Sequence, residues 1–289
     1  MPRVEIGAAI GSSFAFIGRA WARAWGIMLV AVWLAAALAA IQALRPEWTF
    51  APLLGLVLKF LVGVAVVGAL YRVGIESRHP GDPEFRAHAA GFQWGGLEWR
   101  VLGANLLIAL IVFGVAVVFG IIWAILFGVT AASDQADLQG LSSGDNSARM
   151  QALVHILLGP AGVISLAIMI PALVASLYFG ARLSLYTLVA ADARSFGFDQ
   201  TWRLTRGAIW AIILTWIVTF IAQMALGMLI GLMLGMIGAA LGQTLAAAAW
   251  ISVIAQGVGA AIAPPLSAGL LLYVYNTRRG GEDVAAAFT

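Results

Sequence analysis

Few residues of this 289-residue chain could carry out chemistry, and the sequence contains no cysteine. His79 and His88 lie in one hydrophilic segment. The same segment carries Asp82 and Glu84, so it could bind a metal ion if it folded back on itself. Solvated loop histidines are far commoner than ligands, so we expect no metal and no cofactor. There is no Gly-Lys-Ser/Thr phosphate loop and no His-Glu-x-x-His helix. The chain is therefore expected not to be an enzyme.

The composition predicts a membrane protein. Hydrophobic residues make up 62% of the chain and charged residues 10%, whereas soluble domains have about 45–50% and 25%. Apolar runs long enough to cross a bilayer recur along the chain. Backbone groups in lipid must be satisfied within a helix or a closed barrel, and no segment alternates as a barrel strand does. We expect an all-α transmembrane helix bundle, one domain over residues 1–289, with spans at 25–44, 51–71, 101–127, 153–185, 208–237 and 245–275.

The distribution of basic residues predicts the orientation. With the amino terminus inside, the inner segments hold thirteen of the sixteen Lys and Arg residues. The outer segment from 130 to 149 is instead acidic and rich in Ser and Gly. Positive charge collects on the cytoplasmic side. We therefore expect a multi-pass protein of the bacterial inner membrane with both termini, including a tail at 277–289, in the cytoplasm.

A tryptophan and an arginine lie close together in the sequence before each odd-numbered span. The pairs are Trp21 with Arg23, Trp99 with Arg100, and Trp202 with Arg203. The even-numbered spans end on Tyr and Arg, which suggests three copies of one hairpin, each preceded by an interfacial amphipathic helix. The alternative is that aromatic residues and arginine collect at membrane interfaces in any protein.

Helix breakers precede each of these exits, at Gly63, Pro171 and the pair Pro264–Pro265. Matching interruptions in repeated membrane units are a pointer to a ligand site near the midplane. If their helices converge, Arg72, Arg182 and Arg278 would surround the cytoplasmic mouth of that site and favour an anionic headgroup. The competing interpretation is that the breakers only let long helices bend around one another.

Two segments are predicted to contact lipid headgroups from the surface. Residues 1–24 form an amphipathic helix, whose apolar stripe is Ile6, Ile10, Phe14, Ile17 and Trp21. A shorter segment around Trp202 carries Arg203 and Arg206. The functional interpretation is recognition of anionic phospholipid, and the simpler one is anchoring.

The spans themselves hold few polar residues. Apart from Arg182 near the cytoplasmic end of the fourth, Lys59 is the one charged side chain in a predicted span, about 12 Å from its outer end. An intramembrane charge indicates function unless its stem reaches the interface, and both interpretations stay open. No predicted span carries Asp or Glu, which argues against an ion-coupled carrier. Gly227, Gly231 and Gly235 share one helix face and predict close packing against a helix of this chain or of a partner.

The segments "TWRLTRGAIWAI" and "GFQWGGLEWRVLGANLL" resemble bacterial inner-membrane proteins of the YciC-like type. They also resemble the membrane domain fused to some glycerophosphodiester phosphodiesterases. The resemblance implies six membrane helices and transfers no catalytic residue, because the metal-binding catalytic domain has no counterpart here. We therefore expect an accessory or scaffold subunit, or a lipid-interacting module, with phospholipids and a membrane protein as partners and no nucleic acid. The alternative is a transporter or channel for an apolar or amphiphilic substrate.

Overall fold

The computed structural model describes residues 4–44, 48, 50–131, 146–240 and 245–279. The described residues form helices and contain no strand, and six helices are long and apolar enough to cross a membrane. This confirms the predicted all-α class and the number of spans. In chain order the elements are α1 (Ile6–Leu44), α2 (Ala51–Ile75), the 3-10 helices η1 (Glu76–Arg78) and η2 (Ala89–Gly91), α3 (Gly96–Ala131), α5 (Asn146–Leu158), α6 (Pro160–Leu183), α7 (Tyr186–Asp192), α8 (Phe198–Thr205), α9 (Ile209–Ala240) and α10 (Leu245–Arg279).

The chain divides into two compact units. The first comprises Met1–Asn105 together with Ala181–Thr289, and the second is Leu106–Gly180. The hydrophobic core lies in the first unit, where α1, α2, α7 and α10 supply most of its buried residues. One transmembrane domain over residues 1–289 stays a prediction.

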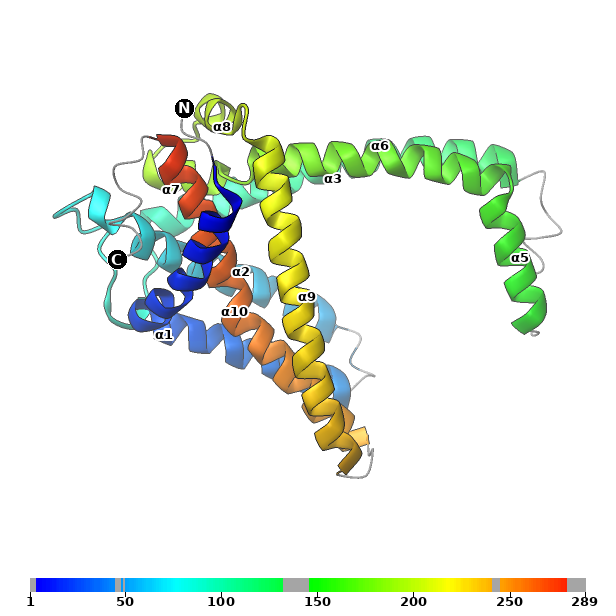
Figure 1. Ribbon diagram of the computed structural model, residues 1–289, viewed down its shortest axis with the longest axis horizontal. Coiled ribbons are helices and arrows are strands. Elements are labelled where there is room, and N and C mark those ends of the chain that lie inside the picture. Colours follow the sequence, from blue (N-terminus) through cyan, green and yellow to red (C-terminus); the bar gives the residue numbers. More distant parts are fainter. Residues whose placement is uncertain (1–3, 45–47, 49, 132–145, 241–244, 280–289) are drawn as a thin grey trace. The chain divides into compact units, whose positions relative to one another are not determined.

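Close packing of α1 against α10 builds the centre of the first unit (Figure 1). Small residues at helical spacing, among them Ala9, Ser13 and Ala20, are fully buried on one face of α1. Opposite them, a Cβ atom added to Gly269 of α10 would lie 2.8 Å from the Cβ of Phe16 and 3.0 Å from the Cα of Ser13. Small residues let the two backbones approach, which increases the dispersion contact available between helices in lipid.

Helix α1 changes direction at Ala24, whose φ of −124° and ψ of 25° are not helical. The kink lies at the predicted boundary between the amphipathic segment and the first span. Residues 1–3 of that segment are outside the described part. The packed face is the small-residue face, whereas the predicted apolar stripe is half-buried or exposed. Apart from Trp21, which contacts α10, the stripe is therefore available to lipid. The core contains the other face of the helix, which the sequence pattern does not single out.

A separate entry helix precedes two of the three odd-numbered spans. The first part of α1 precedes the first span, and α8 precedes α9. Before α3, however, residues 79–95 contain only the 3-10 helix η2, so the predicted amphipathic helix is missing there. The likeness of the three hairpins as repeats stays a prediction.

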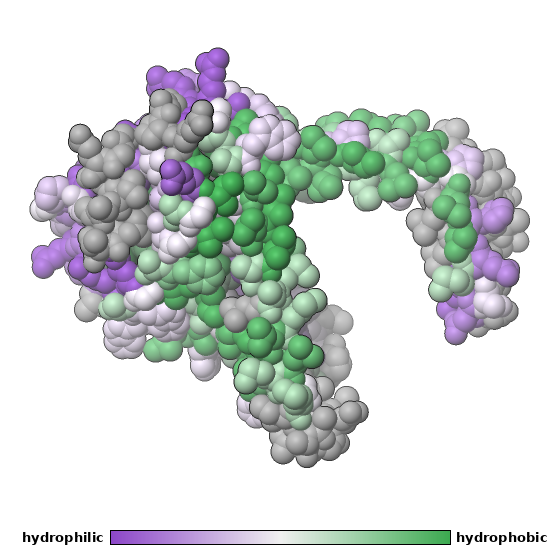
Figure 2. Space-filling view, viewed as in Figure 1, coloured by the Kyte–Doolittle hydropathy of each residue, from purple (hydrophilic) through white to green (hydrophobic). Residues whose placement is uncertain are grey.

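The second unit contains the larger part of α3, all of α5 and most of α6. Within it, Trp123 Nε1 donates a 3.0 Å hydrogen bond to Ser165 Oγ, which joins α3 to α6. The predicted start of the fourth span at 153 was wrong, because α5 ends at Leu158 and α6, where the candidate span Gly162–Asp192 starts, begins at Pro160. Proline suits the first position of a helix, where its missing N–H costs nothing. Apolar side chains cover the α3 and α6 segments (Figure 2).

Several predictions concern segments outside the described residues. These are most of the acidic segment 130–149, part of the break between the predicted spans 208–237 and 245–275, and the tail beyond Arg279. They stay predictions.

Candidate functional site

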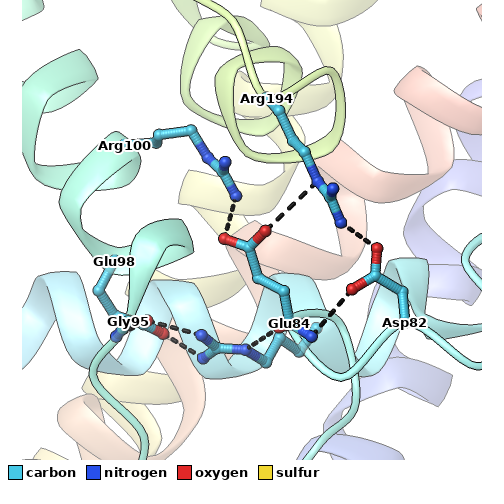
Figure 3. Close-up of polar contacts among 7 residues, drawn as sticks. Asp82, Glu84, Gly95, Glu98, Arg100 and Arg194 are labelled. Atoms are coloured by element: carbon cyan, nitrogen blue, oxygen red, sulfur yellow. Dashed lines mark hydrogen bonds and ion pairs between the residues drawn. The ribbon is translucent and has the colours of Figure 1, made fainter.

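The end of α2 and the start of α3 are joined by a buried ion pair. Arg72 donates to both carboxylate oxygens of Glu98, with Nη2 2.6 Å from Oε2, and both side chains are almost fully buried. The Gly95 N–H donates to the same carboxylate at 2.9 Å. A Cβ atom on Gly68 would lie 2.5 Å from Glu98 Oε1, so glycine leaves room for the pair. Figure 3 shows the fork-like geometry, which fixes direction as well as charge.

Further charges extend this pair into a network (Figure 3). Arg72 Nε also donates to the carbonyl of Glu84, at 2.8 Å. The carboxylate of Glu84 pairs with Arg100 of α3 and with Arg194, whose Nε lies 3.3 Å away. Arg194 pairs in addition with Asp82. The network ties the loop between α2 and α3 to the segment that follows α7.

A second cluster of charges surrounds Asp192, the last residue of α7. Its side chain is fully buried and accepts a 2.6 Å hydrogen bond from the Tyr275 hydroxyl. Arg279 also pairs with it, and His79 Nε2 lies 2.7 Å from its Oδ1. Burial of the imidazole, followed by the nearby guanidinium of Arg194, lowers the pKa of His79. The lowered pKa favours the neutral imidazole, and the tautomer that fits this contact donates its Nε2–H to Asp192.

Two arginines from other helices hold the carboxyl end of α8. Arg182 donates to the Trp202 carbonyl at 3.0 Å and to Thr205 Oγ1 at 3.2 Å. Its guanidinium also stacks 4.4 Å from the centre of the Trp202 ring. Arg278 donates from Nε to the Leu204 carbonyl at 2.9 Å. Cations favour a helix carboxyl end, where the last carbonyls lack helical partners.

These contacts change what can be expected of the predicted headgroup arginines. Arg72, Arg182 and Arg278 are all at most 8% exposed and bond to groups of the protein itself. Arg203 of α8 and Arg206 directly after it are exposed, so they are the members of the set whose charges remain accessible. Lipid binding by any of the five stays a prediction.

Besides Glu76 near the end of Pro52–Arg78, two carboxylates lie at the ends of helices long enough to cross a membrane, Glu98 near the start of Gly96–Leu126 and Asp192 at the end of Gly162–Asp192. All three lie outside the shorter predicted spans, so the absence of Asp and Glu from the membrane-crossing segments stays a prediction. Sequence reasoning did not single out Glu98 or Asp192. The available signal was an acid directly beside an apolar run, in reach of the arginines that end other spans. Among the described residues, no group of His, Asp and Glu could hold a metal ion.

A cavity of about 480 Å³ lies between α1, α2 and α10. It is partly open, and its walls are mainly Ala, Val, Leu and Gly. Two predicted breakers, Gly63 and Pro264, line it, and so does Lys59. Pro171 belongs to the other unit, so convergence of all the breakers stays a prediction. The volume is within the range of about 300–1,000 Å³ that is usual for small-molecule sites.

The prolines of α10 each leave a carbonyl without its usual helical donor. Proline has no N–H, so the carbonyl four residues earlier loses its bond. For Pro265 that carbonyl belongs to Ala261, and the Trp21 indole donates to it at 3.2 Å. For Pro264 it belongs to Ala260, which lines the cavity. The breakers therefore create one contact that joins α1 to α10 and one acceptor beside the cavity.

The predicted glycine face of α9 is exposed. A Cβ atom on Gly227, Gly231 or Gly235 would meet no described atom within 4 Å. Packing of this face against a helix of the described chain is therefore not seen, and packing against a partner stays a prediction. Gly227 borders a smaller groove between α9 and α10.

Comparisons of the chain with protein-family models, with curated proteins and with solved structures find no match. The resemblance to YciC-like proteins accordingly stays a prediction.

Proposed function

We propose that this protein is a non-enzymatic membrane module that binds a membrane lipid in the cavity between α1, α2 and α10. The observation that carries the proposal is the cavity itself: it is partly open, has mainly apolar walls and lies between three helices long enough to cross a bilayer. Such a cavity is accessible to a lipid chain from the hydrocarbon phase. Of the two roles expected from the sequence, a lipid-interacting module fits this geometry better than a scaffold.

The packing beyond the cavity favours binding over passage through the first unit. The lining extends along α2 to Val67 and along α10 to Pro264. One turn further along α2, Leu70 and Tyr71 are buried, and Leu272 packs against Gly74. The charge network then joins the helix ends. A transporter would have to open this packed region, whereas a binding site needs no such change.

The proposal places the protein in the bacterial inner membrane with both termini in the cytoplasm. It rests on the arginine distribution and on the position of the arginine-bearing helix ends. Within the first unit these ends meet in the two charge clusters around Glu98 and Asp192. A chain with both termini inside requires all these arginine-bearing helix ends to lie on the same side of the membrane.

Photocrosslinking tests the lipid-binding proposal. The full chain is reconstituted in nanodiscs with a trace of phospholipid that carries a diazirine in its acyl chain. We expect crosslinks at Ala31 and Val66. Unlabelled lipid should suppress these crosslinks once it saturates the cavity. The yield of crosslinks at the exposed Met228 of α9 should fall only in proportion to the fraction of labelled lipid, because bulk lipid covers this residue. Crosslinking at the cavity that behaves like Met228, or is absent, would overturn the proposal.

Purification in a mild detergent distinguishes the remaining roles. A monodisperse particle that retains phospholipid supports the proposal. Stable co-migration with a second membrane protein, without retained lipid, would indicate the scaffold role instead.

A further inference from the structure

The cavity between α1, α2 and α10 has a polar end and an apolar end. Its polar side chains are Lys59 of α2 and Gln256 of α10. The two helices run in the same direction, since Lys59 and Gln256 share the cavity and, later on both helices, Gly74 packs against Leu272. Lys59 and Gln256 therefore lie at the same end. From Lys59 to Val67, the last lining residue of α2, the cavity extends about 12 Å along the helix.

The charge at the polar end is unbalanced. None of the described residues that line the cavity carries a carboxylate. Among the described residues no acidic side chain pairs with Lys59, whereas Arg72, Arg182 and Arg278 all have protein acceptors. A charge within a membrane span is costly and is normally paired or directed to water. An anionic group at this end would supply the missing counter-charge.

Gln256 adds a second requirement to the headgroup. Its amide can both donate and accept hydrogen bonds, so it suits hydroxyl groups better than a trimethylammonium group, which offers neither. The apolar end is formed by Gly63, Val66 and Val67 on α2 and by Gly259 and Ala260 on α10. A Cβ atom at Gly63 or Gly259 would meet nothing within 4 Å. Each glycine therefore leaves space for a chain to lie across the helix.

We infer that the cavity binds one anionic phospholipid of the surrounding membrane, with the headgroup at Lys59 and Gln256 and one acyl chain towards Pro264. The lipid class that meets both requirements is a phosphatidylglycerol, which has a phosphate for the ammonium group and hydroxyls for the amide. The inference rests on the proposed function, since it names the lipid that the same cavity would hold. The topology predicted from arginine counting puts this headgroup in the outer leaflet.

Native mass spectrometry of the full-length protein tests the inference. The protein is released from nanodiscs that contain equal amounts of phosphatidylglycerol and phosphatidylcholine with identical acyl chains. We expect wild type to retain one phosphatidylglycerol in preference to phosphatidylcholine. Lys59→Gln should reduce that preference about tenfold, the value of one charge-assisted hydrogen bond. Lys59→Arg keeps the charge and should keep the preference.

Variants that fill the cavity separate this inference from the proposed function. Gly63→Leu with Gly259→Leu should abolish retention of both lipids, because the added side chains occupy the apolar end. Gly120→Leu on α3 is the matched control, since a Cβ atom there also meets nothing within 4 Å and the residue does not line the cavity. Elution volume and helical content establish that each variant is folded.

Three results would be decisive against one or both ideas. Equal retention of the two lipids by wild type, lost in the cavity-filling variant, would overturn the headgroup assignment and leave lipid binding intact. A preference that Lys59→Gln leaves unchanged would also overturn the assignment. Retention that is unaffected by filling the cavity would overturn the proposed function and the inference together.

Discussion

The indole Nε1 of Trp21 donates a hydrogen bond to the carbonyl oxygen of Ala261, 3.2 Å away, although the residues are 240 positions apart. Pro265 is the reason that this acceptor is available, since it has no N–H to continue the helix. In lipid no water replaces a missing backbone partner, so an unsatisfied carbonyl must find a donor within the protein. The interfacial tryptophan thus joins the entry helix to the interrupted last span.

Trp21→Phe should lower the stability of the detergent-solubilised protein by about 1–3 kcal/mol, the cost of an unsatisfied buried polar group. In a Pro265→Ala background the new N–H can bond to Ala261, so the same substitution should cost much less. Thermal or denaturant unfolding of the four proteins in this double-mutant cycle measures the coupling. Trp210→Phe is the control, because Trp210 is 82% exposed. Equal penalties in both backgrounds would contradict this role.

Glu98→Gln should destabilise the protein by about 3–5 kcal/mol, because Arg72 then keeps a buried charge without a counter-charge. The double variant Arg72→Met with Glu98→Leu should recover most of this loss, since apolar pairs often replace buried ion pairs without penalty. Arg23→Gln removes one partner of the exposed Arg23–Glu76 pair and should cost only about 0–1 kcal/mol. Similar losses for Glu98→Gln and Arg23→Gln in unfolding experiments would argue against a structural ion pair.

Gly269→Ala should destabilise the protein by about 1–3 kcal/mol through overpacking. The added Cβ atom would meet the backbone of α1 at Ser13, which cannot move as a side-chain end can. Gly114→Ala makes the same change on α3, where the Cβ atom meets nothing within 4 Å, and should cause no loss. The unfolding midpoints of the two variants measure the difference, and equal midpoints would show that α1 and α10 are not closely packed.

Stability should fall at acid pH through His79. Its pKa is lowered in the folded protein, mainly by burial and then by Arg194, so the folded state binds the proton less well than the unfolded state. This contribution is complete above the unfolded pKa of about 6.5 and is lost as the pH falls below it. His79→Gln cannot be protonated but can still donate to Asp192. Unfolding midpoints of the two proteins should therefore converge or cross between about pH 7.5 and 5, and parallel curves would contradict the prediction.

Cysteine labelling should establish the orientation, because the chain contains no cysteine. Ser147→Cys, near the start of α5, should react with an impermeant maleimide in intact cells. Ser195→Cys, between α7 and α8, should react only after permeabilisation. Both serines are exposed, so burial does not limit the reaction. The opposite pattern would reverse the assignment of the arginine-rich side.

The sequence predicts properties of this protein that depend on local composition. Apolar runs identify six spans, since length and hydropathy alone decide whether a helix can cross a bilayer. The change from an amphipathic to an apolar pattern also locates the bend in α1, where the structure has its kink at Ala24. Each of these features depends on neighbouring residues in the chain.

Other predictions failed or stayed open because they depend on the partner of a residue. Arg72 was expected to face a lipid headgroup, but its bidentate partner is Glu98 of the next helix. Nothing in the sequence around Gly227, Gly231 and Gly235 reveals whether another helix reaches them. The predicted helix before α3 is absent, since residues 79–95 form an irregular loop that the charge network holds in place.

The sequence by itself thus determined that this is a membrane protein, where its helices lie, and the positions of its breakers and interfacial arginines. It could do so because hydrophobicity and proline act locally. Only the tertiary structure decided which arginines are neutralised within the protein. It also brought Trp21 to the carbonyl freed by Pro265 and placed Lys59 and Gln256 at one end of an apolar cavity. Such pairings join residues far apart in the chain, and helix packing selects them by shape and charge.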